Sequence, residues 1–439
     1  MSLSTQPYKG ARDFYPEDKR RQDFMFSTIR RCVKSFGYEE YDAPILEPLD
    51  LYIAKSGEEL VNEQTYSFID RGGRSVAIRP EMTPTVSRMV AKRYHELTFP
   101  VRWFSIPNLW RYERPQRGRL REHWQLNVDI FGVQDSNAEL ELIMVSDAIF
   151  KAFKASRSMY EIRINHRRLM DHIFEKYLGL DKAQAYSMAK LIDRRTKMDP
   201  SMFLAEIDAV FTPSQRENGA TEKLLAVLNS DDIKLLPDEL SNLESLKELE
   251  SIIEKCIYHG IDNVTFDISI MRGFDYYNGI VFEIFDKHPD NNRSMMGGGR
   301  YDGLVGLFGV QPVPTAGFGL GDATLANFLE LHGLMPELKT DTDIYLIPVG
   351  HNIDECLKVA KMLREMNVNV AVDLTDKKLG DRIRVAHKKG IRYVLIVGKK
   401  ELDSDQYTLR DVESSVEEKH SLERIVSLVL DRRIHHNIE

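Results

Sequence analysis

The chain has 439 residues, of which 42% are hydrophobic and 29% are charged, and its formal net charge is −8. This composition is typical of a globular protein with several domains, and the acidic balance excludes a uniformly basic nucleic-acid binder. No apolar stretch approaches the roughly 20 residues that cross a bilayer, and the N-terminus has no apolar run like that of a signal peptide. Cys32, Cys256 and Cys356 form no CxxC pair, so we expect a reduced, cytoplasmic protein without a cysteine-based metal site.

The N-terminal part of the chain predicts a sheet-forming domain with antiparallel connections. Residues 14–37 have helical periodicity between Pro16 and Gly37, and alternating runs on both sides of residues 71–73 indicate a β-hairpin. The next segments follow in the order helix at 84–97, strand at 101–113, strand at 123–133 and helix at 137–154. No βαβ repeat occurs here, so a nucleotide site in this region would not be of the Rossmann type.

The middle of the chain changes character twice. From about Asn165 to His259, Leu, Glu, Lys and Ala dominate with helical spacing, which predicts an inserted helical domain. Strand patterns return at residues 263–270 and 279–285, before a glycine-rich stretch that begins at residue 297. Residues 315–333 then read as a strand that runs into a helix.

A further domain begins near Asp341. Its segments alternate strand, helix, strand, helix and strand, and the strands are continuous apolar runs. Such runs are typical of a sheet that is covered on both faces. The pattern predicts a small α/β domain with parallel strand pairing.

Two basic segments interrupt the acidic background. Residues 111–121 contain five arginines against Glu113, and residues 377–400 contain nine Lys or Arg against Asp381. One such run is usually a solvated surface, whereas two in different domains favour an extended polyanion as partner. Arginine suits phosphate oxygens, and Glu113 is expected on the same strand face as Arg111, where it can accept a hydrogen bond from an adenine amino group.

Residues 111–129 resemble motif two of class II aminoacyl-tRNA synthetases, with an Arg-x-Glu, a loop and the strand sequence QLNVD. In detail, RYERPQRGRLRE is similar to the histidine-specific family. Three further segments resemble signatures of that family: 79–83, 271–279 and 297–303. KGARDFYPED and the Asp-Ala-Pro at 42–44 resemble the family's N-terminus and its motif one, and the last domain resembles its anticodon-binding domain.

The resemblance implies an α+β fold, in which an antiparallel-sheet catalytic domain with a helical insertion is followed by a C-terminal α/β anticodon-binding domain. The implied domains are residues 1–164 and 261–335 for the two parts of the catalytic domain, 165–260 for the insertion and 341–439 for the anticodon-binding domain. The implied reaction activates L-histidine with ATP and Mg²⁺ and transfers it to the 3′ end of tRNA(His). The resemblance also implies a homodimer that forms through motif one.

The resemblance assigns residues to the nucleotide and to the tRNA. Arg111 and Arg272 would approach the α-phosphate from opposite sides as the catalytic pair. The other ATP contacts would be Glu113 at the adenine, Arg119 at the γ-phosphate and His123 at the position of a stacking aromatic residue. The implied tRNA contacts are Arg114, Gln116 and Arg117 near the acceptor end, and Lys388 and Lys389 near the anticodon stem-loop.

The same resemblance assigns a histidine pocket. Its implied residues are Glu81, Thr83 and Gln125 at the α-amino group, Asp129 and Tyr277 at the two imidazole nitrogens, Tyr276 and Tyr301 along the walls, and Arg272 beside the substrate. A carboxylate and a phenol that satisfy both ring nitrogens discriminate strongly against amino acids without those nitrogens. We expect no cluster of side chains that binds a metal directly.

Three positions depart from the family pattern. The strand at 317–321 continues as Asp-Ala-Thr, so Thr324 stands where motif three usually has an arginine that contacts ATP. His123 stands at the position of the aromatic residue expected to stack on adenine, and Asp129 stands where the longer Glu is expected. These changes affect the ATP site more than the histidine pocket.

Three alternative functions are considered. A non-catalytic, histidine-binding regulatory paralogue would have a degraded histidine signature and no anticodon-binding domain. A synthetase for another amino acid, such as threonine or proline, is disfavoured by the signature at residues 272–279. A nucleic-acid-binding module without chemistry would leave Glu81, Gln125 and Asp129 unexplained.

Overall fold

The computed structural model describes residues 3–53, 63–116, 118–195, 198–230, 232–271, 276–291, 293–350 and 353–436. The chain divides into two compact units, Met1–Pro336 and Glu337–Glu439. No helix among the described residues has the length and apolar character needed to cross a membrane.

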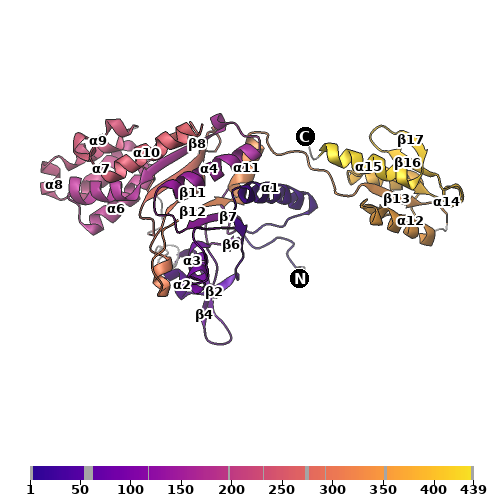
Figure 1. Ribbon diagram of the computed structural model, residues 1–439, viewed down its shortest axis with the longest axis horizontal. Coiled ribbons are helices and arrows are strands. Elements are labelled where there is room, and N and C mark those ends of the chain that lie inside the picture. The colour runs from indigo at the N-terminus through magenta and orange to yellow at the C-terminus, as the bar shows by residue number, and fades with distance from the viewer. Residues whose placement is uncertain are drawn as a thin grey trace. The chain divides into compact units, whose positions relative to one another are not determined.

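The first unit is built on a large sheet with the strand order β1-β5-β7-β12-β11-β10-β8-β9, and β6 pairs with β7 beside this path. Figure 1 labels β6, β7, β8, β11 and β12 of this sheet. The strands are β1 (Glu39–Glu40), β5 (Val101–Ser105), β6 (Asn108–Trp110), β7 (Glu122–Phe131), β8 (Tyr160–His166), β9 (Val264–Phe266), β10 (Ile280–Asp286), β11 (Ser294–Arg300) and β12 (Thr315–Gly321). The pairs β1–β5 and β8–β9 are parallel and the other described pairs are antiparallel. The predicted antiparallel class of sheet is therefore confirmed.

Helices cover one face of this sheet. They are α1 (Pro16–Ser35), α4 (Asn137–Ala152) and α11 (Asp322–Leu331), of which α4 packs on β12 and α11 packs on β7 and β12. Along β7, Leu126, Val128 and Ile130 join the hydrophobic core on this side. Because side chains alternate along a strand, the polar residues between them point to the opposite face. The predicted site residues of β7, Gln125 and Asp129, thus lie on the face that these three helices do not cover.

A three-stranded sheet contains the predicted hairpin. It has the order β2-β4-β3, with β2 (Leu46–Pro48), β3 (Tyr66–Ile69) and β4 (Ser75–Ile78), and the helices α2 (Asp50–Ile53) and α3 (Thr83–Lys92) accompany it. Buried Arg79 directly follows β4 and links this sheet by hydrogen bonds to two other segments. Its guanidinium donates to the carbonyl oxygens of Ala43, at 2.6 Å, and Asn108, at 2.9 Å. The 42–44 segment is thereby tied to β6.

Consecutive helices separate β8 from β9, as the helical spacing predicts. They are α5 (Arg167–His172), a π-helical turn (Ile173–Tyr177), α6 (Lys182–Arg194), α7 (Pro200–Val210), α8 (Pro213–Glu217), α9 (Ala220–Leu228) and α10 (Glu244–Tyr258). Asp181, Asp199 and Thr212 cap three of them by accepting backbone N–H groups. α10 packs against α4, β8 and β9, and Figure 1 shows the helices gathered beside β8.

The second unit has a five-stranded sheet with the order β14-β13-β15-β16-β17. Its elements are β13 (Ile344–Pro348), α12 (Ile353–Glu365), β14 (Val370–Val372), α13 (Leu379–Lys388), β15 (Tyr393–Val397), α14 (Lys399–Ser404), β16 (Tyr407–Asp411), β17 (Glu417–His420) and α15 (Leu422–His436). The predicted parallel pairing holds for β13 with β14 and β15. Pairing along β15, β16 and β17 is antiparallel, so the parallel prediction was incomplete.

Gly298, in the middle of β11, provides a test of the close strand packing. A Cβ at this position would overlap the carbonyl oxygen of Gly317 and lie 2.5 Å from the Cβ of Phe318. We expect Gly298→Ala to destabilise the first unit by about 1–3 kcal/mol, because strand backbone has to move. Gly303→Ala is the matched control, since nothing lies near its Cβ position, and it should change stability by less than about 0.5 kcal/mol. Thermal melting compares the two variants; equal melting temperatures would contradict the packing argument.

Candidate active site

A narrow cavity of about 40 Å³ opens on the face of the large sheet that α1, α4 and α11 leave uncovered. Polar side chains from β7, from the segment before α3, and from the segments around β10 and β11 converge on it. Its lining residues are Glu81, Thr83, Arg111, Gln125, Asn127, Asp129, Tyr276, Tyr277, Gly297, Tyr301, Gly317, Phe318 and Gly319. Eight residues predicted from the sequence therefore lie around one cavity, although they span more than 200 positions of the chain.

Asp129 is the most unusual polar group of the cavity. Its carboxyl is buried in the centre of the sheet, where Oδ1 accepts a short hydrogen bond from the Tyr301 hydroxyl. Among the described residues, its Oδ2 has no hydrogen-bond partner. Burial raises the pKa of Asp129 to about 7, although the hydrogen bond from Tyr301 acts in the opposite direction. A buried acceptor without a donor is costly, so this oxygen is well suited to a donor supplied by a ligand.

Glycines leave the space beside Asp129. Gly317 pairs with Asp129 across β12 and β7, and a Cβ on Gly317 would collide with the Asp129 carboxyl. A Cβ on Gly319 would likewise collide with the Gln125 amide. Gly299 and Gly297 stand opposite these two glycines in β11. These glycines of two adjacent strands therefore place no side chains on the floor of the cavity. Glycine is needed at positions 317 and 319 because the side chains of Asp129 and Gln125 lie directly against the backbone there.

Three tyrosines form one wall. The rings of Tyr276 and Tyr277 have centroids 4.9 Å apart, and those of Tyr276 and Tyr301 are 5.6 Å apart. The buried Tyr276 hydroxyl donates to the Glu81 carboxylate at 3.1 Å, and burial raises its pKa well above the usual range for tyrosine. Glu81 lies two residues before α3 and is itself buried. Its carboxylate is thus directed into the cavity, and it does not serve only as a negative charge near the N-terminus of α3.

Arg111 enters the cavity from a loop. β6 ends at Trp110 and β7 begins at Glu122, and the backbone N–H of Glu113 donates to the carbonyl oxygen of Arg111 at 2.9 Å. The expectation that Arg111 and Glu113 share a strand face is therefore wrong, because the chain turns between them. Nε of Arg111 donates to the carbonyl oxygen of Pro80 at 2.8 Å. This bond fixes the guanidinium next to the segment that carries Glu81.

The loop after Arg111 is held by its own charges. Nη2 of Arg119 donates to the Glu113 carboxylate at 2.8 Å, and Nε of Arg119 makes a second contact with the other carboxylate oxygen. The backbone groups of Gln116 and Arg119 bond each other in both directions at 2.9 Å, which closes a tight turn at Gly118, where φ is +72°. The predicted adenine and γ-phosphate contacts thus bind one another in this structure.

His123, the residue predicted to stack on adenine, is on β7, and the charges of two arginines act on its ring. Burial, together with the positive charges of Arg111 and Arg12, lowers the pKa of His123 to about 3. The ring is therefore neutral at physiological pH, and a neutral imidazole can lie against an aromatic base without adding charge. Its Nδ1 is buried and has no partner among the described residues.

The structure adds residues that the sequence did not single out and leaves others undescribed. Asn127 also lines the cavity. It lies two residues before Asp129 on β7 and points to the same face, so the alternation of side chains along this strand could have suggested it. Arg293 donates to the Gln116 side chain at 3.0 Å and so joins the predicted tRNA-contacting loop; Arg114 lies in the same loop. Arg272 and Arg117 lie outside the described residues. Lys388 and Lys389 are exposed at the end of α13 in the second unit.

Two family models match the chain. The model described as histidyl-tRNA synthetase matches residues 10–325, and the model described as anticodon binding domain matches residues 343–432. The chain is similar to the histidine–tRNA ligase of Leptospira biflexa serovar Patoc, at 45% identity over 94% of each chain. It is also similar to the histidine–tRNA ligase of Thermoplasma volcanium, at 37% identity over 95% of this chain and 96% of the relative.

Solved structures share the fold. A histidyl-tRNA synthetase from Nostoc sp. PCC 7120 aligns with a TM-score of 0.81 at 23% identity, over 98% of this chain and 100% of that one. A protein from Bacillus halodurans, described as an ATP phosphoribosyltransferase regulatory subunit/histidyl-tRNA synthetase, aligns with a TM-score of 0.72 at 20% identity, over 91% of this chain and 99% of that one. At these identities the likeness shows the architecture alone.

The raised pKa of Asp129 predicts a pH-dependent stability. Because the folded-state pKa is raised from 3.8 to about 7, the contribution of this carboxyl to stability is complete below about pH 4 and is lost as the pH rises to about 7. Asp129→Asn removes the charge, so its advantage in melting temperature over the unsubstituted chain should grow between pH 4 and pH 7 and then level off. Asp262→Asn, at an exposed position, should show no such trend; a pH-independent difference for Asp129→Asn would contradict the assignment.

Proposed function

The chain belongs to the histidyl-tRNA synthetase family and is a histidine–tRNA ligase, and we propose that it activates L-histidine in the cavity around Asp129. The observation that supports this placement is the buried carboxylate oxygen of Asp129, which lacks a hydrogen-bond donor among the described residues and lies above a floor of glycines. An imidazole N–H is a donor of the right kind for that oxygen. The anticodon-binding domain that the regulatory alternative lacks is matched at residues 343–432, and no observation favours that alternative.

In this proposal, selectivity comes from the two ring nitrogens of the substrate. Asp129 accepts the N–H of one nitrogen, and the Tyr277 hydroxyl donates to the other. An amino acid without these nitrogens would leave Asp129 desolvated and unpaired, which costs much of its binding free energy. The substrate's α-amino group is assigned to the polar rim formed by Glu81, Thr83 and Gln125, and the rings of Tyr276 and Tyr301 enclose the side chain.

The proposed chemistry is the attack of the histidine carboxylate on the α-phosphorus of ATP. The nucleophile is already ionised, so the site has to align two anions and neutralise charge, and no general base is required. Arg111 and Arg272 supply that charge from opposite sides of the α-phosphate. Arg111 is directed into the cavity by its bond to the Pro80 carbonyl, which supports its part of the assignment. The products are histidyl-adenylate and pyrophosphate.

The remaining nucleotide contacts require the loop to rearrange. Glu113 would accept the adenine amino group, Arg119 would bind the γ-phosphate, and His123 would lie against the base. Since Glu113 and Arg119 pair with one another in the structure, ATP would separate them, offering an anionic phosphate to Arg119 and a neutral amino donor to Glu113. ATP is proposed to enter as its Mg²⁺ complex, so the ion is part of the nucleotide substrate. No group of three potential metal-binding side chains occurs within the described ranges, and no step is assigned to chain-bound metal.

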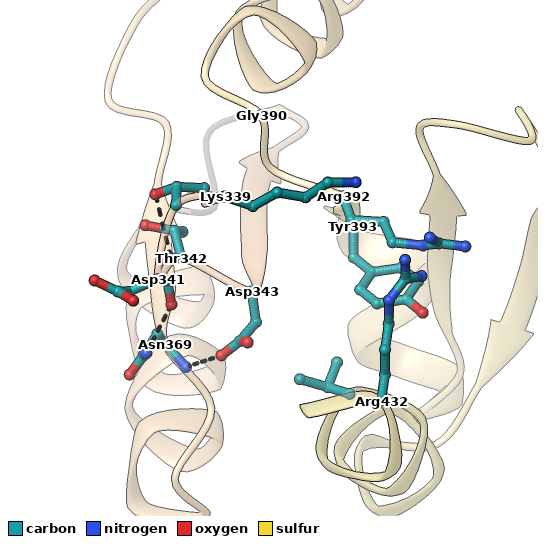
Figure 2. Close-up of a pocket in the computed structure, with 11 residues that line it drawn as sticks. Lys339, Asp341, Thr342, Asp343, Asn369, Gly390, Arg392, Tyr393 and Arg432 are labelled. Atoms are coloured by element: carbon teal, nitrogen blue, oxygen red, sulfur yellow. Dashed lines mark hydrogen bonds between the residues drawn. The ribbon is translucent and has the colours of Figure 1, made fainter. Parts of the chain in front are cut away.

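Two surfaces are proposed to contact tRNA(His). The loop with Arg114, Gln116 and Arg117 would receive the acceptor end, and Lys388 and Lys389 the anticodon stem-loop. In the second unit, Arg392 of the same basic run is already used in ion pairs within the chain, with Asp411 and Glu413, both at 2.7 Å. Figure 2 shows Arg392 and Arg432 beside Lys339 around a cavity of about 410 Å³. Lys339 also pairs with Glu413, so this cavity is an ion-paired surface, and exposed Lys388 and Lys389 are better candidates.

We also propose a cytoplasmic homodimer with the four-part domain division implied by the sequence. Exposed apolar side chains on the three-stranded sheet and beside it support a protein interface in this region; they are Ile45, Leu46, Ile53, Phe68, Ile69, Leu307 and Phe308. The described elements between β8 and β9 are all helical, from α5 to α10, which supports the boundaries of the inserted domain at about residues 165 and 260. The buried, unpaired cysteines fit a reducing compartment.

The proposed activity is tested by ATP–pyrophosphate exchange with each of the twenty amino acids and Mg²⁺. We expect exchange with histidine and, for the other nineteen, rates lower by roughly 10⁴ or more, because they leave buried polar groups unpaired. Asp129→Asn should abolish most of the exchange while tRNA binding remains. Exchange with another amino acid, or histidine binding without any exchange, would contradict the proposal.

The tRNA placement is tested by removing two positive charges. The double variant Lys388→Gln, Lys389→Gln should weaken tRNA binding and reduce the slope of log affinity against log salt by about 0.7–0.9 for each lost phosphate contact. The matched control removes Lys358 and Lys361, two exposed lysines on α12 of the same unit. If both double variants charged tRNA with the Michaelis constant of the unsubstituted chain at several salt concentrations, the placement would be wrong.

A further inference from the structure

We propose that Arg12, in the N-terminal segment, contacts ATP and replaces the arginine that motif three lacks at Thr324. This inference rests on the proposed function, because it adds a binding residue to the nucleotide end of the same site. Four features of the structure lead to it: the anchoring of Arg12, the docking of its segment, the surroundings of Thr324 and the unused hydrogen-bonding capacity of the guanidinium.

Arg12 is anchored where the two nucleotide motifs meet. Its Nη2 pairs with Oδ2 of Asp322 at 2.7 Å, and Asp322 is the first residue of α11, two positions before Thr324. The other carboxylate oxygen of Asp322 accepts the backbone N–H of Trp124 in β7 at 3.0 Å. One buried carboxylate therefore links the N-terminal segment, the motif-two strand and the motif-three helix, and it places the guanidinium between them.

The N-terminal segment is docked on the motif-two strand. The carbonyl oxygen of Gly10 accepts the backbone N–H groups of Arg121, at 2.9 Å, and Glu122, at 3.2 Å. Gly10 has a φ of +89°, and a Cβ there would lie 2.8 Å from the Arg121 side chain, so glycine permits this approach. Arg121 also donates to the Tyr8 hydroxyl at 3.1 Å. Arg12, two residues after Gly10, is thereby held in register with the nucleotide loop.

Thr324 supplies no positive charge, and its hydroxyl is already engaged by backbone carbonyl groups. Its hydroxyl donates to the helix-start carbonyl of Gly321, at 2.9 Å, and lies 3.2 Å from the carbonyl oxygen of Met295. Its methyl group lies 3.7 Å from the Cβ position of Gly118, at the tip of the motif-two loop. Because Thr324 carries no charge, a cation for this part of the nucleotide has to come from another segment.

The Arg12 guanidinium has capacity for a ligand. Its side chain is 28% exposed, whereas that of Asp322 is 2% exposed, so the arginine is the accessible partner of the pair. Among the described residues, its Nε has no hydrogen-bond acceptor although it is buried. The positive charge of Arg12 also acts on His123, as does that of Arg111, which places all three groups in one neighbourhood. The exposed part of the side chain makes the guanidinium charge available to a phosphate or base acceptor of ATP.

The test compares Arg12→Ala, Arg12→Lys and the control Arg21→Ala in ATP–pyrophosphate exchange with histidine. Arg21 is matched because it also joins the N-terminal region to α11, through an exposed pair with Glu330. We expect Arg12→Ala to raise the ATP Michaelis constant by at least about tenfold and to change that of histidine by less than about twofold, because a charge-assisted hydrogen bond to the nucleotide is lost. Arg12→Lys should recover part of the loss, and Arg21→Ala should match the unsubstituted chain.

Two results would overturn the inference. An unchanged ATP Michaelis constant in Arg12→Ala would show that Arg12 does not contact the nucleotide. A parallel rise for ATP and histidine, together with a lower melting temperature, would show that the residue acts only by pinning β7 and α11. The stabilisation of each variant against melting by Mg²⁺-ATP alone is measured in parallel. If the unsubstituted chain exchanges with no amino acid, the proposed function fails, and this ATP-dependent change in melting temperature still decides the role of Arg12.

Discussion

The structure of the site depends on one constraint, a carboxylate buried in the middle of a large sheet. An ionised group in such a position is expensive, because burial removes its hydration. Asp129 is tolerated there because Tyr301 donates to one oxygen and because Gly317, its partner in β12, leaves room for the carboxyl. The same arrangement leaves the second oxygen without a hydrogen-bond donor among the described residues. In the proposed function this oxygen accepts an N–H of the substrate imidazole, so the selectivity for histidine would depend on this side chain.

Tyr301 keeps its position through a second buried charge pair on the other face of the sheet. The preceding residue, Arg300, makes two hydrogen bonds of 2.7 Å to Glu139 near the start of α4. It also donates to the carbonyl oxygens of Val133 and Asp135. Because neighbouring residues of a strand point to opposite faces, fixing Arg300 against α4 directs Tyr301 toward Asp129. A buried pair of this kind adds little net stability, but it specifies one arrangement and is costly to break.

Sequence reasoning recovered the parts of this molecule that local pattern encodes. The helical period of residues 14–37, the hairpin around residues 71–73 and the alternation in β7 all correspond to elements of the structure. It failed where pairing across the chain decides the result. The turn between Arg111 and Glu113 is held by contacts with other parts of the chain, since the Tyr112 N–H donates to the Gln64 carbonyl and Nε of Arg121 donates to the Glu113 carbonyl. The antiparallel β16 and β17 could not be distinguished from loop by their mixed composition.

The site residues show the same division. Family motifs gave the members of the cavity, but a motif does not say which groups already bind one another. Hence the pairs Glu113–Arg119 and Tyr276–Glu81 emerged only from the folded structure. The glycines of β11 and β12 are a related case. A cluster of glycines most often marks a turn, and only the register against β7 reveals that they make room for two polar side chains.

At the proposed nucleotide end of the site, arginines are paired with carboxylates of the same chain. Arg119 is paired with Glu113, and Arg12 with Asp322. Each pairing limits the repulsion among guanidinium groups that have to lie close together before any phosphate is present, since like charges a few ångströms apart repel strongly in a partly buried site. Under the proposed function, ATP would replace Glu113 as the partner of Arg119, whereas Arg12 would keep its bond to Asp322. The free energy of ATP binding would then depend on the difference between two pairings of Arg119, so Glu113 would affect nucleotide affinity as directly as Arg119 does.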